Sequence, residues 1–445
     1  MNFLKKYFTK LNSPVVSLQF IQLFRFTTLF LISIAFAKSN YSVKEIGLYE
    51  KFIYFAGALS FFWTNGLIQS LLGQYHTFKD KTEQSKYLFN NILVSIGFSF
   101  LILIMIASFE KPMCLFFINN QSIPFKYLFL TYLLISPVTF FVEYIYLLNN
   151  KLVKIYGYGI ISYVIQLLLV VIPSFIYNDL AYSLWGLIIV VIIRLLWLLK
   201  VMLQFTKMEY SWEYIKHILK YSRPLILGAF IAGSIPYVDG ILVSMHFDDT
   251  IFAVFRYGAR ELPISVLLAS AFSNAMIPVL NTSENFTDGL KQLKKQALQL
   301  MHLLYPFSIA LLLASFYLFK FVFNPNFIES SHIFNVMLLL IIPRMLFPQT
   351  ILMAKGQNSY LLLSSILEFM IKLIMSIWLL NIMGLIGIAF ATLIAFIFEK
   401  VILMYFVKKQ NDILPQQYTY LGWYFFYSGL IIAVYFLVEK VISYN

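Results

Sequence analysis

The sequence predicts an all-α polytopic membrane protein with two pseudo-symmetric six-helix lobes around a central cavity and an extra C-terminal helix. Of its 445 residues, 60% are hydrophobic and only 12% are charged, and the mean hydropathy is +0.80. Soluble globular domains carry roughly a quarter charged residues. The apolar segments are continuous rather than alternating in short strands, so they indicate membrane-spanning helices and not a membrane barrel.

Thirteen segments are long enough to cross a membrane, which takes about 20 mainly apolar residues. They cover approximately residues 15–37, 46–73, 87–109, 125–148, 154–177, 180–203, 221–245, 252–281, 298–323, 331–354, 360–381, 384–407 and 419–441. The connections favour a cytoplasmic N-terminus, because nineteen Lys and Arg, beginning with Lys5, Lys6 and Lys10, fall on that side and seven on the other. The odd number of spans then places the C-terminus outside.

The first six spans and the next six look like weak repeats. Ser13-Pro14 opens the first span as Arg223-Pro224 opens the seventh. Halves of six spans share one topology and are related by an axis along the membrane normal, which predicts two lobes that enclose a cavity. The predicted division is an N-lobe of residues 1–207, a C-lobe of residues 208–410 and an additional transmembrane helix within residues 411–445.

The longest cytoplasmic connection, about residues 204–220, separates the two halves. Trp212, Tyr214 and Lys216 follow one another at helical spacing there. Such a pattern predicts an amphipathic helix that lies on the inner membrane surface, and a solvated linker is the alternative.

Ionisable residues inside the spans are the candidate functional residues, because burying a charge in hydrocarbon costs at least a few kcal/mol. Arg25 lies in the middle of the first span, and Gln22 and Thr28 each lie three residues from it on the same side. A guanidinium group presents a forked set of donors that fits phosphate oxygens. Arg25 is therefore our first candidate for a phosphate contact, and the alternative is that it ties helices together.

Further cations near the ends of spans two and eight could complete a cationic ring in the cavity. They are Lys51, Arg256 and Arg260. The neighbouring Glu50 and Glu261 could instead neutralise Lys51 and Arg256. Tyrosines near the predicted cavity, Tyr49, Tyr237 and Tyr257, could stack on sugar rings.

Charged residues in the second half leave alternatives open. Asp239, in a span interrupted by Gly and Pro, either forms a salt bridge with one of the arginines, which we favour, or binds a coupling H⁺ or Na⁺. Glu368 and Lys372 are four residues apart, a spacing that predicts an intrahelical ion pair. Arg344, flanked by prolines, either faces the cavity or anchors a kink. Arg194, in the sixth span, is undecided in the same way.

Four short motifs carry a resemblance to a known family. They are Ile46–Tyr49 and Ala253–Tyr257 at the starts of spans two and eight, Ala275–Leu280 at the end of span eight, and Met383–Thr392 near span twelve. In order and spacing they resemble the multidrug/oligosaccharidyl-lipid/polysaccharide (MOP) exporter superfamily, and within it the O-antigen and capsule repeat-unit flippases of the polysaccharide transporter family. The likeness covers roughly residues 10–407. Such flippases usually have twelve or fourteen spans, so a thirteenth is a departure.

The resemblance implies a flippase of the bacterial cytoplasmic membrane. Its cargo would be an undecaprenyl-pyrophosphate-linked oligosaccharide, moved from the inner to the outer leaflet by alternating access, with or without a glycan polymerase as partner. The lipid-flipping members of this family place functional basic residues on spans one, two and eight, and Arg25, Lys51 and Arg260 match those spans by position.

Two other functions compete with this one. A drug/cation antiporter of the same superfamily would favour acidic cavity residues, whereas the candidates here are mainly Arg and Lys. A membrane glycan polymerase or ligase would need a large outer loop, and the longest outer connection is about residues 110–124. The single cysteine and five scattered histidines argue against a metal site, and the sequence has no catalytic constellation or ATP-binding motif. We therefore expect a transporter without cofactors, in contact with membrane lipid and not with nucleic acid.

Overall fold

A computed structural model describes residues 14–114, 122–261, 263–282 and 286–442. Within these ranges the chain forms helices and no strand, which confirms the predicted all-α class. The predicted cytoplasmic residues Lys5, Lys6 and Lys10 lie outside the described residues, as does part of the predicted outer connection, residues 115–121.

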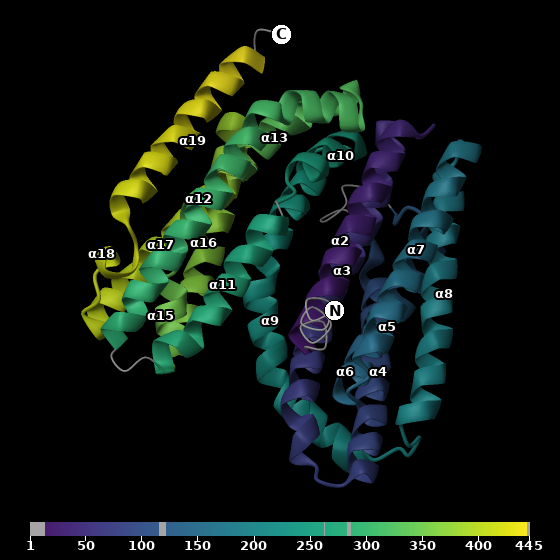
Figure 1. The fold of residues 1–445 in the computed structure, drawn as a ribbon. Coiled ribbons are helices and arrows are strands. Elements are labelled where there is room, and N and C mark those ends of the chain that lie inside the picture. Colours follow the sequence, from purple (N-terminus) through teal and green to yellow (C-terminus); the bar gives the residue numbers. More distant parts are fainter. Residues whose placement is uncertain (1–13, 115–121, 262, 283–285, 443–445) are drawn as a thin grey trace, which may run out of the picture. The chain divides into compact units, whose positions relative to one another are not determined.

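The chain forms two compact units, and unit 1 comprises residues 1–234 and 244–253. Its helices are α2 (Pro14–Lys38), α3 (Val43–Gln74), η1 (Tyr75–Thr77), α4 (Lys81–Met113), α5 (Lys126–Thr139), α6 (Phe141–Leu148), α7 (Leu152–Ile176), α8 (Leu180–Phe205), most of α9 (Trp212–His246) and the start of α10 (Asp249–Gly258). Helix α7 packs between α2 and α8 (Figure 1). A Cβ atom on Gly186 would lie 2.0 Å from the carbonyl oxygen of Leu169, so only glycine permits this approach of α8 to α7.

Unit 2 comprises residues 235–243 and 254–445. Beyond the remaining parts of α9 and α10, its helices are α11 (Pro263–Thr282), α12 (Phe286–Leu318), η3 (Phe319–Phe323), η4 (Pro325–Phe327), α13 (Glu329–Leu338), α14 (Ile341–Arg344), α15 (Pro348–Ala354), α16 (Asn358–Met383), α17 (Leu385–Asn411), α18 (Pro415–Tyr418) and α19 (Leu421–Ile442). Helices α16 and α17 pack along one another, and α19 packs against α12 (Figure 1). The division into an N-lobe and a C-lobe was predicted from sequence repeats and not from contacts between helices. It therefore stays a prediction.

All thirteen predicted spans fall on helices, but three of them are broken. The fourth is divided between α5 and α6, the eighth is divided between α10 and α11, and the tenth bends by 45° between α14 and α15. Among the described residues, eleven helices are long and apolar enough to cross a membrane, or twelve if that bent pair is one span. Helix α3, the predicted second span, is not among them.

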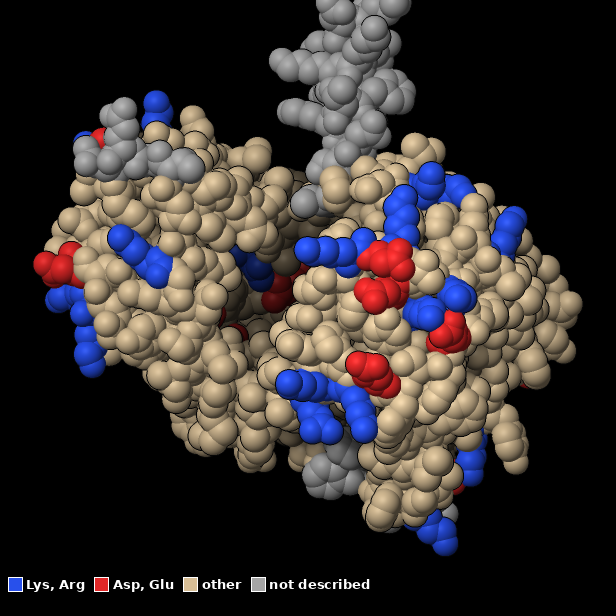
Figure 2. Space-filling model, turned by 90° about the horizontal axis from the view of Figure 1, so that it is seen from below, with Lys and Arg blue, Asp and Glu red and all other residues tan. Residues whose placement is uncertain are grey.

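The amphipathic helix predicted within residues 204–220 is the start of a longer helix, and its place on the membrane surface stays a prediction. Helix α9 begins at Trp212 and runs without a break to His246. The connection before it is fixed to α4: Lys86 Nζ lies 2.6 Å from Glu209 Oε1, and the Asn90 side-chain oxygen accepts a hydrogen bond of 3.0 Å from the Ser211 N–H. Figure 2 shows one end of the molecule, where Lys and Arg, some beside acidic side chains, stand on a largely uncharged surface.

Candidate functional site

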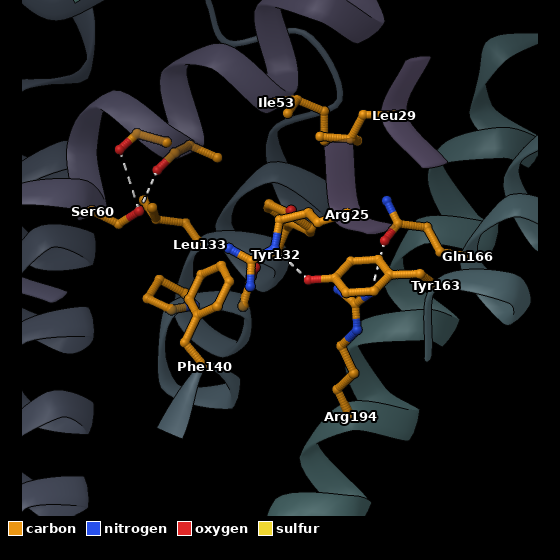
Figure 3. Close-up of a pocket in the computed structure, with 14 residues that line it drawn as sticks. Arg25, Leu29, Ile53, Ser60, Tyr132, Leu133, Phe140, Tyr163, Gln166 and Arg194 are labelled. Atoms are coloured by element: carbon orange, nitrogen blue, oxygen red, sulfur yellow. Dashed lines mark hydrogen bonds between the residues drawn. The ribbon is translucent and has the colours of Figure 1, made fainter. Parts of the chain in front are cut away.

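A pocket of about 170 Å³ lies inside unit 1 (Figure 3). Helices α2, α3, α5, α7 and α8 line it, together with Phe140. Its polar lining is Arg25, Ser60, Tyr132, Ser136, Tyr163, Gln166 and Arg194. The pocket therefore combines two guanidinium groups with hydroxyl and amide groups, within helices that are otherwise mainly apolar.

A break in the fourth predicted span shapes one wall of this pocket. Helix α5 ends at Thr139, shortly after Pro137, and α6 begins at Phe141. Proline has no N–H to donate within a helix and disrupts the turn before it. The intervening Phe140 places its ring centre 4.5 Å from the guanidinium carbon of Arg25, a cation–π contact.

Arg25 joins three helices at the pocket. Its Nη2 lies 2.8 Å from Glu143 Oε1 in α6, and its Nε donates a hydrogen bond to the Tyr163 hydroxyl in α7. The Glu143 side chain is only 6% exposed, whereas that of Arg25 is 29% exposed. Arg25 thus ties helices together, as the alternative proposed, and still presents part of its guanidinium group to the pocket.

Arg194 is the second cation of the pocket, and its partners are neutral. Its Nε donates to Ser162 Oγ and its Nη2 to Gln166 Oε1, both at 2.8 Å. Its guanidinium carbon lies 4.6 Å from the centre of the Tyr163 ring. The sequence left Arg194 undecided, although Ser162 and Gln166, four residues apart on α7, have the spacing of two acceptors on one helical face.

The two arginines face a single carboxylate in this group. Glu143 balances one positive charge, so Arg25 and Arg194 together leave a net charge of +1 beside the pocket. The Tyr163 ring lies between the two guanidinium groups (Figure 3). This arrangement can bind an anion with forked donors and with neighbouring hydroxyl groups.

Gln22 does not belong to this pocket. It is exposed, whereas Thr28 is buried, so the two do not share a side with Arg25 as predicted. The reason is geometric: each lies three residues from Arg25, but six residues correspond to about 600° of helical rotation, which separates their directions by about 120°.

Lys51 pairs with Asp249, and not with the adjacent Glu50. Lys51 Nζ lies 2.7 Å from Asp249 Oδ1, and the Lys51 side chain is only 6% exposed. Glu50 accepts a hydrogen bond of 3.4 Å from Ser33 Oγ. A Cβ atom on Gly47 would lie 1.8 Å from the carbonyl oxygen of Asp249, so the predicted glycine motif permits α10 to begin against α3.

In unit 2, Glu261 pairs with Arg344, whereas the sequence alternative had placed it with Arg256. Arg344 also lies 5.3 Å from the centre of the Phe396 ring. Arg344 and Glu261 also line a small pocket together. Arg344 therefore forms an ion pair next to the prolines that flank it in the sequence.

Tyr257 is a packing residue and not an exposed platform for sugars. It is 2% exposed, and its ring stacks on Phe327 with 4.3 Å between the ring centres. Arg260 lies over the Tyr257 ring at 5.1 Å. Tyr49 is also buried and packs edge-on against Phe36.

Asp239 forms a salt bridge, as favoured, but its partner is a lysine and not an arginine. Lys372 Nζ in α16 lies 3.0 Å from Asp239 Oδ2, and Thr392 Oγ1 in α17 donates to the same oxygen at 2.9 Å. Lys372 is therefore not paired with Glu368, and the predicted intrahelical pair is wrong. The described residues contain no cluster of three His, Cys, Asp or Glu that could hold a metal ion.

Comparison with known proteins gives structural neighbours only. No family model and no curated protein matches the sequence. A lipid II flippase MurJ in an inward closed conformation is similar with a TM-score of 0.68 at 18% identity, over 96% of this chain and 98% of that one.

Two MATE transporters are also similar. A mutant form of the MATE transporter VcmN of Vibrio cholerae has a TM-score of 0.57 at 16% identity over 91% of this chain and 98% of that one. An outward-facing MATE transporter of the MOP superfamily has a TM-score of 0.54 at 13% identity, over 90% and 96%. This multi-pass membrane protein therefore shares its fold with these transporters, one of which is of the MOP superfamily that the sequence motifs resemble.

Proposed function

We propose that this protein is a flippase for an undecaprenyl-pyrophosphate-linked oligosaccharide repeat unit. It would move this unit from the inner to the outer leaflet of the bacterial cytoplasmic membrane by alternating access, with its N-terminus in the cytoplasm. The product would supply O-antigen, capsule or a related surface polysaccharide. It would act either alone or beside a glycan polymerase that uses the translocated units.

The observation that carries this proposal is the excess positive charge of the pocket in unit 1. Arg194 has neutral hydrogen-bond partners, and Arg25 has one carboxylate. A buried cation in hydrocarbon is costly unless an anion meets it. A pyrophosphate group is multiply anionic, and its oxygens match the forked donors of both guanidinium groups.

The size of the pocket limits what it holds. A volume of about 170 Å³ is below the roughly 300–1,000 Å³ of pockets that enclose drug-sized ligands. It suits a phosphate-sized group and not an oligosaccharide. We assign it to the pyrophosphate head, with the sugars and the polyprenyl chain bound elsewhere.

The charge of the pocket also separates this function from its rivals. A carrier of cationic drugs needs an available carboxylate, whereas Glu143 is engaged by Arg25. The fold similarity to a lipid II flippase supports a lipid-linked cargo. Coupling to H⁺ or Na⁺ stays open within the proposal.

The decisive experiment is a leaflet-accessibility assay for the lipid-linked repeat unit in cells that lack this protein. We expect the unit to accumulate on the cytoplasmic side, and the wild-type gene to restore its exposure outside. Normal translocation together with unpolymerised units outside would overturn the proposal and favour a polymerase or ligase. Normal glycan display with increased sensitivity to cationic drugs would favour an antiporter.

A further inference from the structure

A second buried charge group lies in unit 2, apart from the pocket of unit 1. Asp239 and Lys372 form its centre, with side chains that are 12% and 2% exposed. Asp239 comes from the short part of α9, residues 235–243, that belongs to unit 2, and Lys372 comes from the middle of α16. Thr392 of α17 completes the group with its hydroxyl hydrogen bond to Asp239 Oδ2.

We infer that the ammonium group of Lys372 permanently occupies the place beside Asp239 where a cation could bind, so that this carboxylate takes up no exchangeable Na⁺. The inference concerns the coupling step of the proposed transport and rests on that function for its role in the cell. The geometry itself is independent of the cargo.

Two features of the contact support a built-in cation. The ammonium group lies 3.0 Å from the carboxylate oxygen, a hydrogen-bonded ion-pair distance that leaves no room for an ion between them. Thr392 Oγ1 donates a hydrogen bond of 2.9 Å to the same oxygen, so Asp239 Oδ2 already has two donors.

The second carboxylate oxygen makes the removal of the lysine informative. Asp239 Oδ1 is buried and has no hydrogen-bond partner among the described residues. Without the ammonium group, both oxygens and the Thr392 hydroxyl would surround the space that the lysine side chain now fills. Water can enter a polar space as large as a lysine side chain, and the buried Asp239 carboxylate then needs another counter-ion. We therefore expect the removal of Lys372 to create a Na⁺ site.

Protonation is the competing way to neutralise Asp239, and the surrounding charges bear on it. On α16, Glu368 lies one turn before Lys372, and from α17 the facing group is the neutral Thr392. Both fates are distinguishable, because at pH 8 a proton is scarce and Na⁺ can be supplied freely.

The test is the thermal stability of the purified full-length protein in detergent at pH 8, in NaCl against choline chloride at equal ionic strength. For the wild type and for Lys372→Arg, we expect each protein to have the same melting temperature in NaCl as in choline chloride. We expect a Na⁺-dependent rise of roughly 2–4 °C for Lys372→Ala, and no rise for Lys372→Ala/Asp239→Asn. Lys372→Gln is the second variant if Lys372→Ala does not fold.

Several results would overturn the inference. A Na⁺-dependent rise in the wild type that Asp239→Asn abolishes would show that Asp239 already binds an exchangeable ion. Folded Lys372→Ala or Lys372→Gln protein without a Na⁺ effect would show that no site is created. Because no substrate is present, a failed flippase assay leaves this measurement unchanged, so the two proposals fail separately.

Discussion

Replacing Arg194 with Met tests the pocket in unit 1 with little disturbance of its structure. The variant removes one positive charge and two hydrogen bonds, to Ser162 and Gln166. Both partners are neutral, so no buried carboxylate is left without a counter-ion. The loss of two charge-assisted bonds costs about 1.5–3 kcal/mol each, and we expect the protein still to insert and fold.

The loss of the Arg194 charge should also act on transport directly. At 4 Å and an effective dielectric constant of 20, one pair of unit charges interacts by about 4 kcal/mol. Since each 1.4 kcal/mol is a factor of ten, anion binding should weaken by roughly a hundred- to a thousandfold. We expect surface glycan to fall to the level of cells without the protein when the variant is expressed at wild-type abundance.

Two further variants separate pocket charge from general damage. Arg194→Lys keeps the charge but loses the fork and should retain partial display. Lys86→Met removes a cation elsewhere in unit 1, whose partner Glu209 is 45% exposed, and should leave display unchanged. If folded Arg194→Met protein supports wild-type glycan display, the pocket does not bind the anionic head and the assignment is wrong.

Three other predictions concern Arg25, Arg260 and Gly186. Arg25→Ala and Arg260→Ala should each abolish surface glycan in inserted protein while the Lys variants keep part of it, and normal display in both Ala variants would reject their role. Arg25→Ala should also lower the free energy of unfolding by about 3 kcal/mol because Glu143 loses its partner; a denaturant titration should show recovery in Arg25→Met/Glu143→Gln. Gly186→Leu should lower the melting temperature strongly, because its Cβ meets a carbonyl of α7, whereas at Gly97 a Cβ meets nothing within 4 Å, so Gly97→Ala is the matched control.

The helices could be predicted from the sequence because span length and continuous hydropathy are local properties. The breaks were harder to place. Phe140 separates α5 from α6 three residues after Pro137, and the eighth predicted span is interrupted between Gly258 and Pro263. Proline and glycine are visible in the sequence, but whether they kink or end a helix depends on the packing that surrounds them.

The charge pairs show the limit of local spacing. Neighbouring residues such as Glu50 and Lys51 point about 100° apart on a helix, and Lys51 reaches Asp249 of another helix instead. Lys372 likewise leaves Glu368, four residues away, and pairs with Asp239. Helical periodicity fixes only neighbours within one helix, whereas a buried cation pairs with the carboxylate that tertiary packing brings to it.

The partners of each buried cation therefore identify the anion site better than the position of that cation along its span does. Arg25, Lys51, Arg344 and Lys372 are each within salt-bridge distance of a carboxylate. Such pairs contribute less net attraction for an incoming anion than an uncompensated cation does, because the partner carboxylate repels the anion at nearly the same distance. Arg194 has hydroxyl, amide and aromatic partners instead. Its charge is not cancelled nearby, so the field it adds to the pocket is available to a phosphate.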